Sequence, residues 1–312
     1  MLHLLGILLC SKGKFDRAIE LIQKAVSIQP NNPVYLGNLG VAYRKTNRFE
    51  DAIAAYKKAI SFQPKKISET HFHLGKSLLM LERVDEAQAA LHRAIELKPD
   101  NASAWLTLMN IASKTDVSKA IELGEQATRA CPNAAEPHVN LGVMLKRSGE
   151  VEKSVELFRR AVAVQPTNIQ ALTRLSVVLI SRRQITEGKQ LLEKALSLDA
   201  GSVYCHEASA IYLAQIGDDE NALKAYEAAL AIDSDYPPAL LGAAVAHKKL
   251  GNLTIALEMS IRGIEKQPDN VSALANHGLL LLRLGRHDDA LDFMRRARKI
   301  RSSNSEIHSA LL

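Results

Sequence analysis

Apolar residues recur three and four positions apart along almost the whole chain, in stretches separated by short polar breaks. This spacing places them on one face of an α-helix, so the pattern predicts a succession of amphipathic helices and no β-strand. Every second stretch carries one position that is nearly always small: Gly6, Gly40, Gly75, Met109, Gly142, Ser176, Ala210, Ala244 and Gly278. Neighbouring members of this set are 33 to 35 residues apart. The chain is therefore predicted to be an array of helix pairs.

Breaks between these pairs follow the same period. Small residues let two helices cross closely, and proline ends a helix because it lacks an N–H and clashes with the preceding turn. Six prolines are predicted to end second helices: Pro30, Pro64, Pro99, Pro132, Pro166 and Pro268. The other four are predicted to begin first helices, where proline is tolerated: Pro33, Pro137, Pro237 and Pro238. Turn residues between the helices of a pair are Gly13, Asn47, Gly149, Gly217, Gly251 and Gly285.

The repeat resembles the tetratricopeptide-repeat (TPR) family, whose pattern is W-x2-L-G-x2-Y, then A-x3-F, then P. The second repeat matches it with Leu36, Leu39, Gly40, Tyr43, Ala52, Tyr56, Ala59 and Pro64. Trp105, the only tryptophan, falls in the tryptophan position. The resemblance implies an all-α, right-handed superhelical solenoid of antiparallel helix pairs. Residues 1–312 form a single predicted array, with repeats at about 1–32, 33–66, 67–100, 101–134, 135–168, 169–202, 203–236, 237–270 and 271–304.

The fourth repeat and the two ends depart from this regularity. Repeat four is one residue short, and its turn Ser113–Asp116 together with Gly124 in the aromatic position predicts a distorted unit. Met1 falls inside a first helix, and a further helix is predicted to begin over 305–312. Because terminal solenoid repeats normally need a polar cap, we expect a longer polypeptide with a downstream catalytic domain, or ends covered by self-association.

Composition narrows the class of protein. Aromatic residues make up 4% of the chain, which disfavours β-sandwiches and barrels. The net charge of +6 does not by itself indicate nucleic acid. Cys10, Cys131 and Cys205 match no disulfide framework and no metal-binding spacing. We expect a cytoplasmic protein without membrane insertion, since the N-terminal apolar run is too short to span a bilayer.

Residues that carry chemistry are not arranged in any known catalytic or cofactor motif, so the chain is predicted to be no enzyme, with no cofactor and no metal. His71, His138 and His206 occupy the tryptophan position of three repeats and are predicted to pack rather than to bind a metal. His287, Asp288 and Asp289 stand where TPR turns commonly carry polar residues. The densest basic cluster is predicted to be a solvated helix face: Arg295, Arg296, Arg298, Lys299 and Arg301.

First helices line the concave groove of TPR proteins, so their polar residues are candidate partner-binding groups. Asparagine stands two residues before the small residue in three repeats, at Asn38, Asn140 and Asn276, and His73 holds the same place in a fourth. An asparagine amide can donate to and accept from a peptide backbone at once; the alternatives are a helix-to-helix hydrogen bond or simple solvation. Basic pairs follow the small residue by one turn in repeats two, five and eight: Arg44 and Lys45, Lys146 and Arg147, Lys248 and Lys249.

Groove asparagines in regular repeats are similar to the TPR half of O-linked N-acetylglucosaminyltransferases, including bacterial and SPINDLY-type members. The opening LHLLGILLCSKGKFDRAIELIQKAV and the closing SEIHSALL also resemble theirs. Chaperone-binding TPR domains match poorly, because Gly37 and Val41 stand at two positions of their carboxylate clamp. Three functions remain open. We favour a protein-binding scaffold that holds a protein or extended peptide in its groove. The alternatives are the substrate-recruiting half of a glycosyltransferase and nucleic-acid binding through basic residues.

Overall fold

The computed structural model describes the backbone of residues 1–63 and 67–310, and the side chains of these residues up to 302. The described residues contain helices and turns and no β-strand, which confirms the predicted all-α TPR solenoid. Pro64 and the extra linker residue predicted after it lie outside the described part of the chain, as do residues 311–312.

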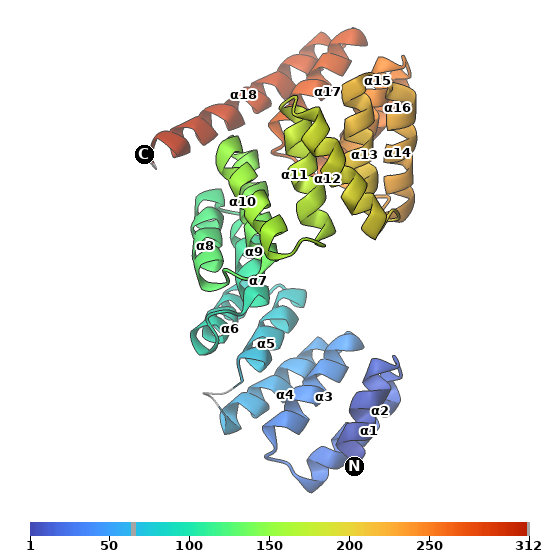
Figure 1. Ribbon diagram of the computed structural model, residues 1–312. Coiled ribbons are helices and arrows are strands. Elements are labelled where there is room, and N and C mark those ends of the chain that lie inside the picture. Colours follow the sequence, from blue (N-terminus) through green and yellow to red (C-terminus); the bar gives the residue numbers. More distant parts are fainter. Residues whose placement is uncertain (64–66, 311–312) are drawn as a thin grey trace. The chain divides into compact units, whose positions relative to one another are not determined.

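Each predicted repeat corresponds to one helix pair (Figure 1). The first helices are α1 (Leu2–Ser11), α3 (Pro33–Lys45), α5 (Ser68–Met80), α7 (Ala102–Ala112), α9 (Ala135–Arg147), α11 (Ile169–Ser181), α13 (Val203–Ile216), α15 (Pro237–Lys249) and α17 (Val271–Arg283). The second helices are α2 (Phe15–Ile28), α4 (Phe49–Phe62), α6 (Val84–Leu97), α8 (Val117–Ala130), α10 (Val151–Val164), α12 (Ile185–Leu198), α14 (Asp219–Ile232), α16 (Leu253–Lys266) and α18 (His287–Ala310).

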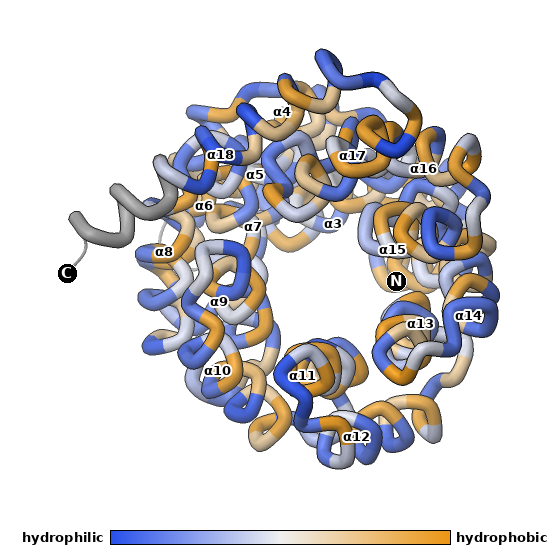
Figure 2. Tube along the Cα trace, turned by 90° about the horizontal axis from the view of Figure 1, so that it is seen from above, coloured by the Kyte–Doolittle hydropathy of each residue, from blue (hydrophilic) through white to orange (hydrophobic). Residues whose placement is uncertain are grey.

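These helices group into two compact units, Met1–Asn140 and Leu141–Leu312, and we call them unit 1 and unit 2. Inside each unit the two helices of a repeat pack on each other, and several first helices also contact the first helix of the next repeat, most extensively α11 and α13. In unit 2, α11, α13 and α15 follow one another along one side, while α12, α14 and α16 lie along the other (Figure 2). A layer of first helices therefore forms one face of the unit.

The turns between helices and the helix N-termini are formed by the residue types that favour them. All six predicted turn residues have positive φ, from 58° at Asn47 to 94° at Gly149. Several first helices begin with an asparagine whose side chain accepts hydrogen bonds from the first turn, as Asn32 does from the N–H groups of Val34 and Tyr35. This interaction satisfies N–H groups that have no partner within the helix. Pro33 and Pro237 occupy the first turn of α3 and α15, as predicted.

Close helix crossings explain the small residues. A Cβ added at Gly40 would stand 2.5 Å from the ring of Tyr56, and one at Gly142 would stand 2.7 Å from the ring of Phe158. Tyr56 and Phe158 are completely buried. Both repeats thus combine a small residue on the first helix with a large one on the second, which lets the two helices approach to contact distance.

In repeat four the large residue lies on the first helix and the small residue on the second. Its first helix, α7, has 11 residues, and Met109 there is fully buried, while Gly124 at the equivalent place on α8 is also buried. The Asp116 side chain accepts from the N–H of Lys119 and caps α8 after the short turn. In repeat four the large residue, Met109, is therefore on the first helix and the small one, Gly124, is on the second. The side chain of Met109 fills part of the space that Gly124 leaves, which reduces the predicted distortion.

The last helix differs from the prediction. A break was expected at Ser302, with a further helix starting at 305, but α18 continues without interruption to Ala310. Ser302 donates its hydroxyl to the carbonyl of Lys299 within the helix. A serine can bond in this way inside a helix, and unlike the proline in six other repeats it does not clash with the preceding turn.

Candidate functional site

Two recurring positions of the first helices carry the predicted partner-binding residues. We call them the minus-two and plus-four positions, counted from the small residue of each repeat. Asn38, His73, Asn140, Arg174 and Asn276 occupy minus-two positions. Arg44, Lys146 and Lys248 occupy plus-four positions, and Lys45, Arg147 and Lys249 follow them directly.

The three asparagines make different contacts. Asn38 is half-buried, and its amide nitrogen lies 2.8 Å from Nε2 of His3 on the first helix of the preceding repeat. Asn140 donates to the carbonyl of Glu136 in its own helix at 3.0 Å. Asn276 makes no hydrogen bond within the described residues and faces a pocket. Asn38 thus fulfils the helix-to-helix alternative, and Asn276 best keeps the free amide that peptide binding requires.

The residues of the three basic pairs differ in exposure and in whether they have an acidic partner. The Nζ atom of Lys249 lies 2.7 Å from a carboxylate oxygen of Asp219 on α14, so its charge is compensated within the unit. Lys45 and Arg147 are exposed, and no acidic partner for them occurs among the described side chains. Arg44 and Lys248 are half-buried. The first member is therefore the more buried residue in the pairs of repeats two and eight, while both members are exposed in repeat five.

Plus-four and minus-two residues of adjacent repeats meet. The positive charge of Arg44 in repeat two acts on His73 in repeat three, and that of Arg174 in repeat six acts on Lys146 in repeat five. Lys248 in repeat eight and Asn276 in repeat nine line one pocket. We name these pairs junction A (Arg44, His73), junction B (Lys146, Arg174) and junction C (Lys248, Asn276).

Junction A is positively charged. Burial, followed by the charges of Arg44, Lys76 and Lys45, lowers the pKa of His73 to about 4. Burial also raises the pKa of Tyr56 to about 12, against a smaller opposing effect of the nearby Arg44 guanidinium. His73 is therefore a neutral imidazole at neutral pH.

Junction B contains an ion pair that the sequence prediction missed. The Arg174 nitrogen Nη1 lies 3.0 and 3.2 Å from the two carboxylate oxygens of Glu207 on α13, and Nη2 lies 3.2 Å from the hydroxyl oxygen of Tyr236. Tyr236 donates to Glu207 in turn. Burial lowers the pKa of Arg174, but Glu207 and Tyr236 outweigh this effect and the net shift is upward.

Lys146 lies close enough to this ion pair to be affected by its charges. Its side chain is exposed, yet surrounding protein and the charge of Arg174 lower its pKa, with Glu207 opposing them. Arg174 could have been found from the sequence, because it stands at the minus-two position. Glu207 carried no such signal.

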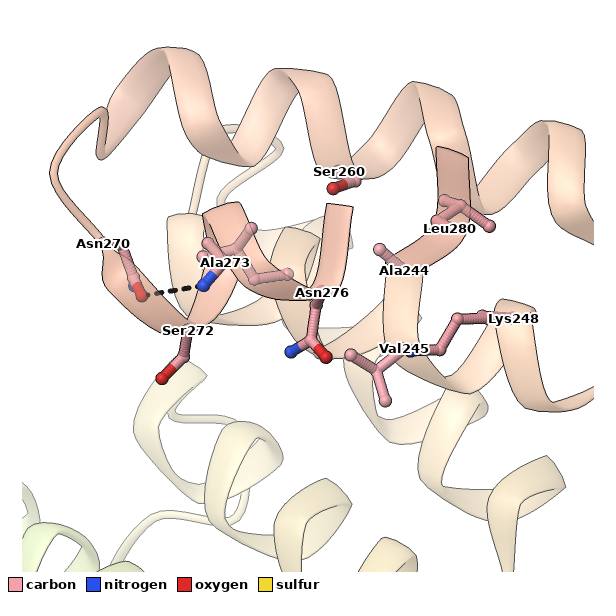
Figure 3. Close-up of a pocket in the computed structure, with 11 residues that line it drawn as sticks. Ala244, Val245, Lys248, Ser260, Asn270, Ser272, Ala273, Asn276 and Leu280 are labelled. Carbon is pink, nitrogen blue, oxygen red and sulfur yellow. Dashed lines mark hydrogen bonds between the residues drawn. The ribbon is translucent and has the colours of Figure 1, made fainter. Parts of the chain in front are cut away.

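Junction C is a cavity of about 210 Å³ between α15 and α17, floored by α16 (Figure 3). Its walls include Ala244, Val245 and Leu280, and Asn276 and Lys248 supply its polar groups. The cavity has a structural cause: Ser260, 4% exposed, stands where other repeats place a large residue such as Tyr56 or Phe158. Ser260 bonds Nδ1 of His277 at 2.9 Å and fills little of the space.

Other candidates behave as packing or surface residues. His71 and His138 are buried, as predicted, and His206 is half-buried. Arg286 forms a salt bridge with Asp289 at 2.6 Å in the turn that contains His287 and Asp288.

Among the described residues no three His, Cys, Asp or Glu side chains are placed to hold a metal ion. Cys10, Cys131 and Cys205 are free thiols. In the same part of the chain, no helix combines the length and apolarity needed to cross a bilayer.

Comparisons with known proteins agree with the repeat architecture. Residues 2–211 match the family model for the cilia and flagella-associated protein 70 C-terminal domain, and residues 203–236 and 241–305 match tetratricopeptide-repeat models. A curated relative is anaphase-promoting complex subunit CDC16 of Saccharomyces cerevisiae, 28% identical over 117 residues, which cover 35% of this chain and 14% of the yeast protein.

Solved structures share the fold at low identity. A chain of the APC/C hetero-tetramer Cut9–Hcn1 aligns with a TM-score of 0.58 and 15% identity, over 94% of this chain and 54% of that chain. A C-terminal part of a TPR protein from Cytophaga hutchinsonii aligns with a TM-score of 0.52 and 18% identity, over 76% and 97% of the two chains. None of these descriptions names a glycosyltransferase, so that resemblance stays a prediction.

The family match covers more than half of the chain, from the first helix into α13. It coincides with the helix pairs, the small crossing residues and the turn residues described above. The chain therefore belongs to the tetratricopeptide-repeat family described as the cilia and flagella-associated protein 70 C-terminal domain.

Proposed function

We propose that this chain is a non-catalytic interaction scaffold that binds an extended segment of a partner protein along its first helices. The observation that carries the proposal is junction C, where an apolar cavity opens beside the unpaired amide of Asn276 and the ammonium group of Lys248. Ligand pockets typically combine apolar walls with a few polar groups that fix orientation. The resemblance to APC/C subunits, which are parts of a multi-protein complex, supports a role in assembly.

Junction C offers separate contacts for a side chain and for a backbone. Val245 and Leu280 would cover an apolar side chain of the partner. In Figure 3 the amide of Asn276 lies next to Val245, where it would donate to and accept from one peptide unit. Lys248 would attract a carbonyl or carboxylate oxygen. The chain would bind a protein in the cytoplasm without a cofactor.

Selection of random peptides on the full chain tests this proposal. The peptides obtained are measured against wild type and against Ala244→Met, which fills the cavity in the manner of Met109 while leaving the bond between Ser260 and His277 intact. We expect at least a tenfold loss of affinity, because an apolar side chain of the ligand can no longer be buried. The Asn276→Ala variant should lose about 0.5–1.5 kcal/mol of binding free energy.

A matched control is Ile232→Met, which introduces the same side chain at an exposed position on α14 of the same unit. It should leave affinity unchanged. Selected peptides that bind wild type and Ala244→Met equally would contradict the proposal, as would a selection that yields no peptide above background.

A further inference from the structure

Junction C lacks a ring that two other repeats place at the same point. The second-helix residue that follows the small residue of the first helix by sixteen positions is Tyr56 in repeat two, Tyr226 in repeat seven and Ser260 in repeat eight. The buried ring of Tyr56 stacks with His73, with centroids 6.2 Å apart. A Cβ added at Gly242 would stand 2.2 Å from the buried ring of Tyr226. Each tyrosine ring therefore reaches the minus-two position of the following repeat.

The cavity of junction C occupies the equivalent space in repeat eight. Its lining includes Ser260 in place of the tyrosine, together with Ala244 and the minus-two residue Asn276. Ala244 is compatible with a ring, because repeat seven combines Tyr226 with an alanine, Ala210, at the corresponding point. An apolar cavity of about 150 Å³ can hold benzene, and this one measures about 210 Å³. It has room for a ring that repeat eight itself does not supply.

The floor of the cavity can form a hydrogen bond with a hydroxyl group. Ser260 Oγ lies 2.9 Å from Nδ1 of His277, and both residues are buried. Burial, followed by the charge of Arg286, lowers the pKa of His277, so its imidazole is neutral at pH 7. If Nδ1 accepts, the oxygen of Ser260 keeps lone pairs for a ligand O–H; if Nδ1 donates, Ser260 keeps its own O–H for a ligand oxygen. A phenol hydroxyl, which both donates and accepts, suits either tautomer.

We propose that junction C binds the side chain of a tyrosine in a partner segment, with the ring in the cavity and the hydroxyl on Ser260. The inference rests on the proposed function and names the side chain that the cavity holds. A segment along the first helices would reach the cavity from the side of Asn276 and Val245, and Figure 3 shows Ser260 on the opposite side. Lys248 in the wall favours the same occupant, because an ammonium group is attracted to the face of an aromatic ring.

Three peptides of glycine and serine that differ in one central residue test the inference on the full chain. The central residue is tyrosine, phenylalanine or leucine, the last because Leu91 and Leu192 fill the equivalent place in repeats three and six. Binding is followed by NMR through the methyl signals of Ala244 and Val245. The tyrosine peptide should bind about fivefold tighter than the phenylalanine peptide, the effect of one hydrogen bond, and the leucine peptide should bind most weakly. Equal binding of the tyrosine and leucine peptides would overturn the inference.

Variants of Ser260 locate the effect. Ser260→Ala should abolish the difference between the tyrosine and phenylalanine peptides. The matched control Ser197→Ala, at an exposed serine on α12 of the same unit, should keep that difference. Ser260→Tyr supplies the missing ring from the chain itself and should abolish binding of the tyrosine peptide. Unchanged binding to this variant would contradict the inference.

The outcomes separate this inference from the proposed function. Selected peptides that need the cavity but contain no tyrosine would leave the proposed function standing and overturn the inference. A tyrosine peptide that binds wild type and Ala244→Met equally would occupy another place, and this result would overturn the inference alone. If the selection yields no peptide and the tyrosine peptide does not bind, both fail.

Discussion

Junctions A and B are built from the same positions of different repeats, yet only one of them is electrostatically complete. At B, Arg174 is held by Glu207 and Tyr236, and its side chain is 19% exposed. At A, no carboxylate pairs with Arg44 among the described side chains, and its guanidinium acts on Tyr56 and His73 instead. The comparison shows that the same repeat position can join neighbouring repeats in one part of the chain and carry no counter-charge in another.

The largest effect is expected from breaking junction B. Glu207→Gln removes the carboxylate but keeps the shape, so the guanidinium of Arg174 stays buried without a counter-charge. Breaking one side of a buried ion pair typically costs about 3–5 kcal/mol of unfolding free energy. Urea unfolding should show this loss in unit 2. The control Glu152→Gln removes an acid that is 79% exposed and paired with Arg182, and it should leave stability nearly unchanged.

A smaller loss of stability is expected from a substitution that displaces the buried ring of Tyr56 beside junction A. In Gly40→Ala the new Cβ would stand 2.5 Å from the ring of Tyr56, which is fully buried, so the ring or the helix must shift. Overpacking of this kind costs about 1–3 kcal/mol. In the same helix, Gly37→Ala meets only Thr70 Oγ1 at 3.6 Å and should be neutral or gain up to about 1 kcal/mol from helix propensity. Equal melting temperatures for the two variants would argue against a rigid Tyr56.

The fold followed from the sequence because its signals are local and repeated. The helix pairs, the crossing at Gly40 and the turns at Asn47 and Gly149 are set by residue size and by positive φ, which one sequence reveals. The site depended on which residues of adjacent repeats meet. The sequence marked Arg44 and Asn276 as candidates, but pairing across repeats needs helix geometry, and Glu207 belongs to no repeated pattern.

Titration of His73 is expected to give the smallest effect. Its pKa in the folded chain is about 4, against 6.5 for an ordinary histidine. Between these values the unfolded chain binds a proton that the folded chain does not, so stability falls as the pH drops from 6.5 towards 4. His73→Gln removes this contribution, and its unfolding free energy should decline less over that window than that of wild type. His3, His71 and His277 have lowered pKa values too, so some decline remains in the variant. Denaturant titrations of both proteins at pH 7 and pH 5 measure the difference. Parallel declines would mean that the imidazole is well solvated, and the electrostatic contrast between junctions A and B would lose its main support.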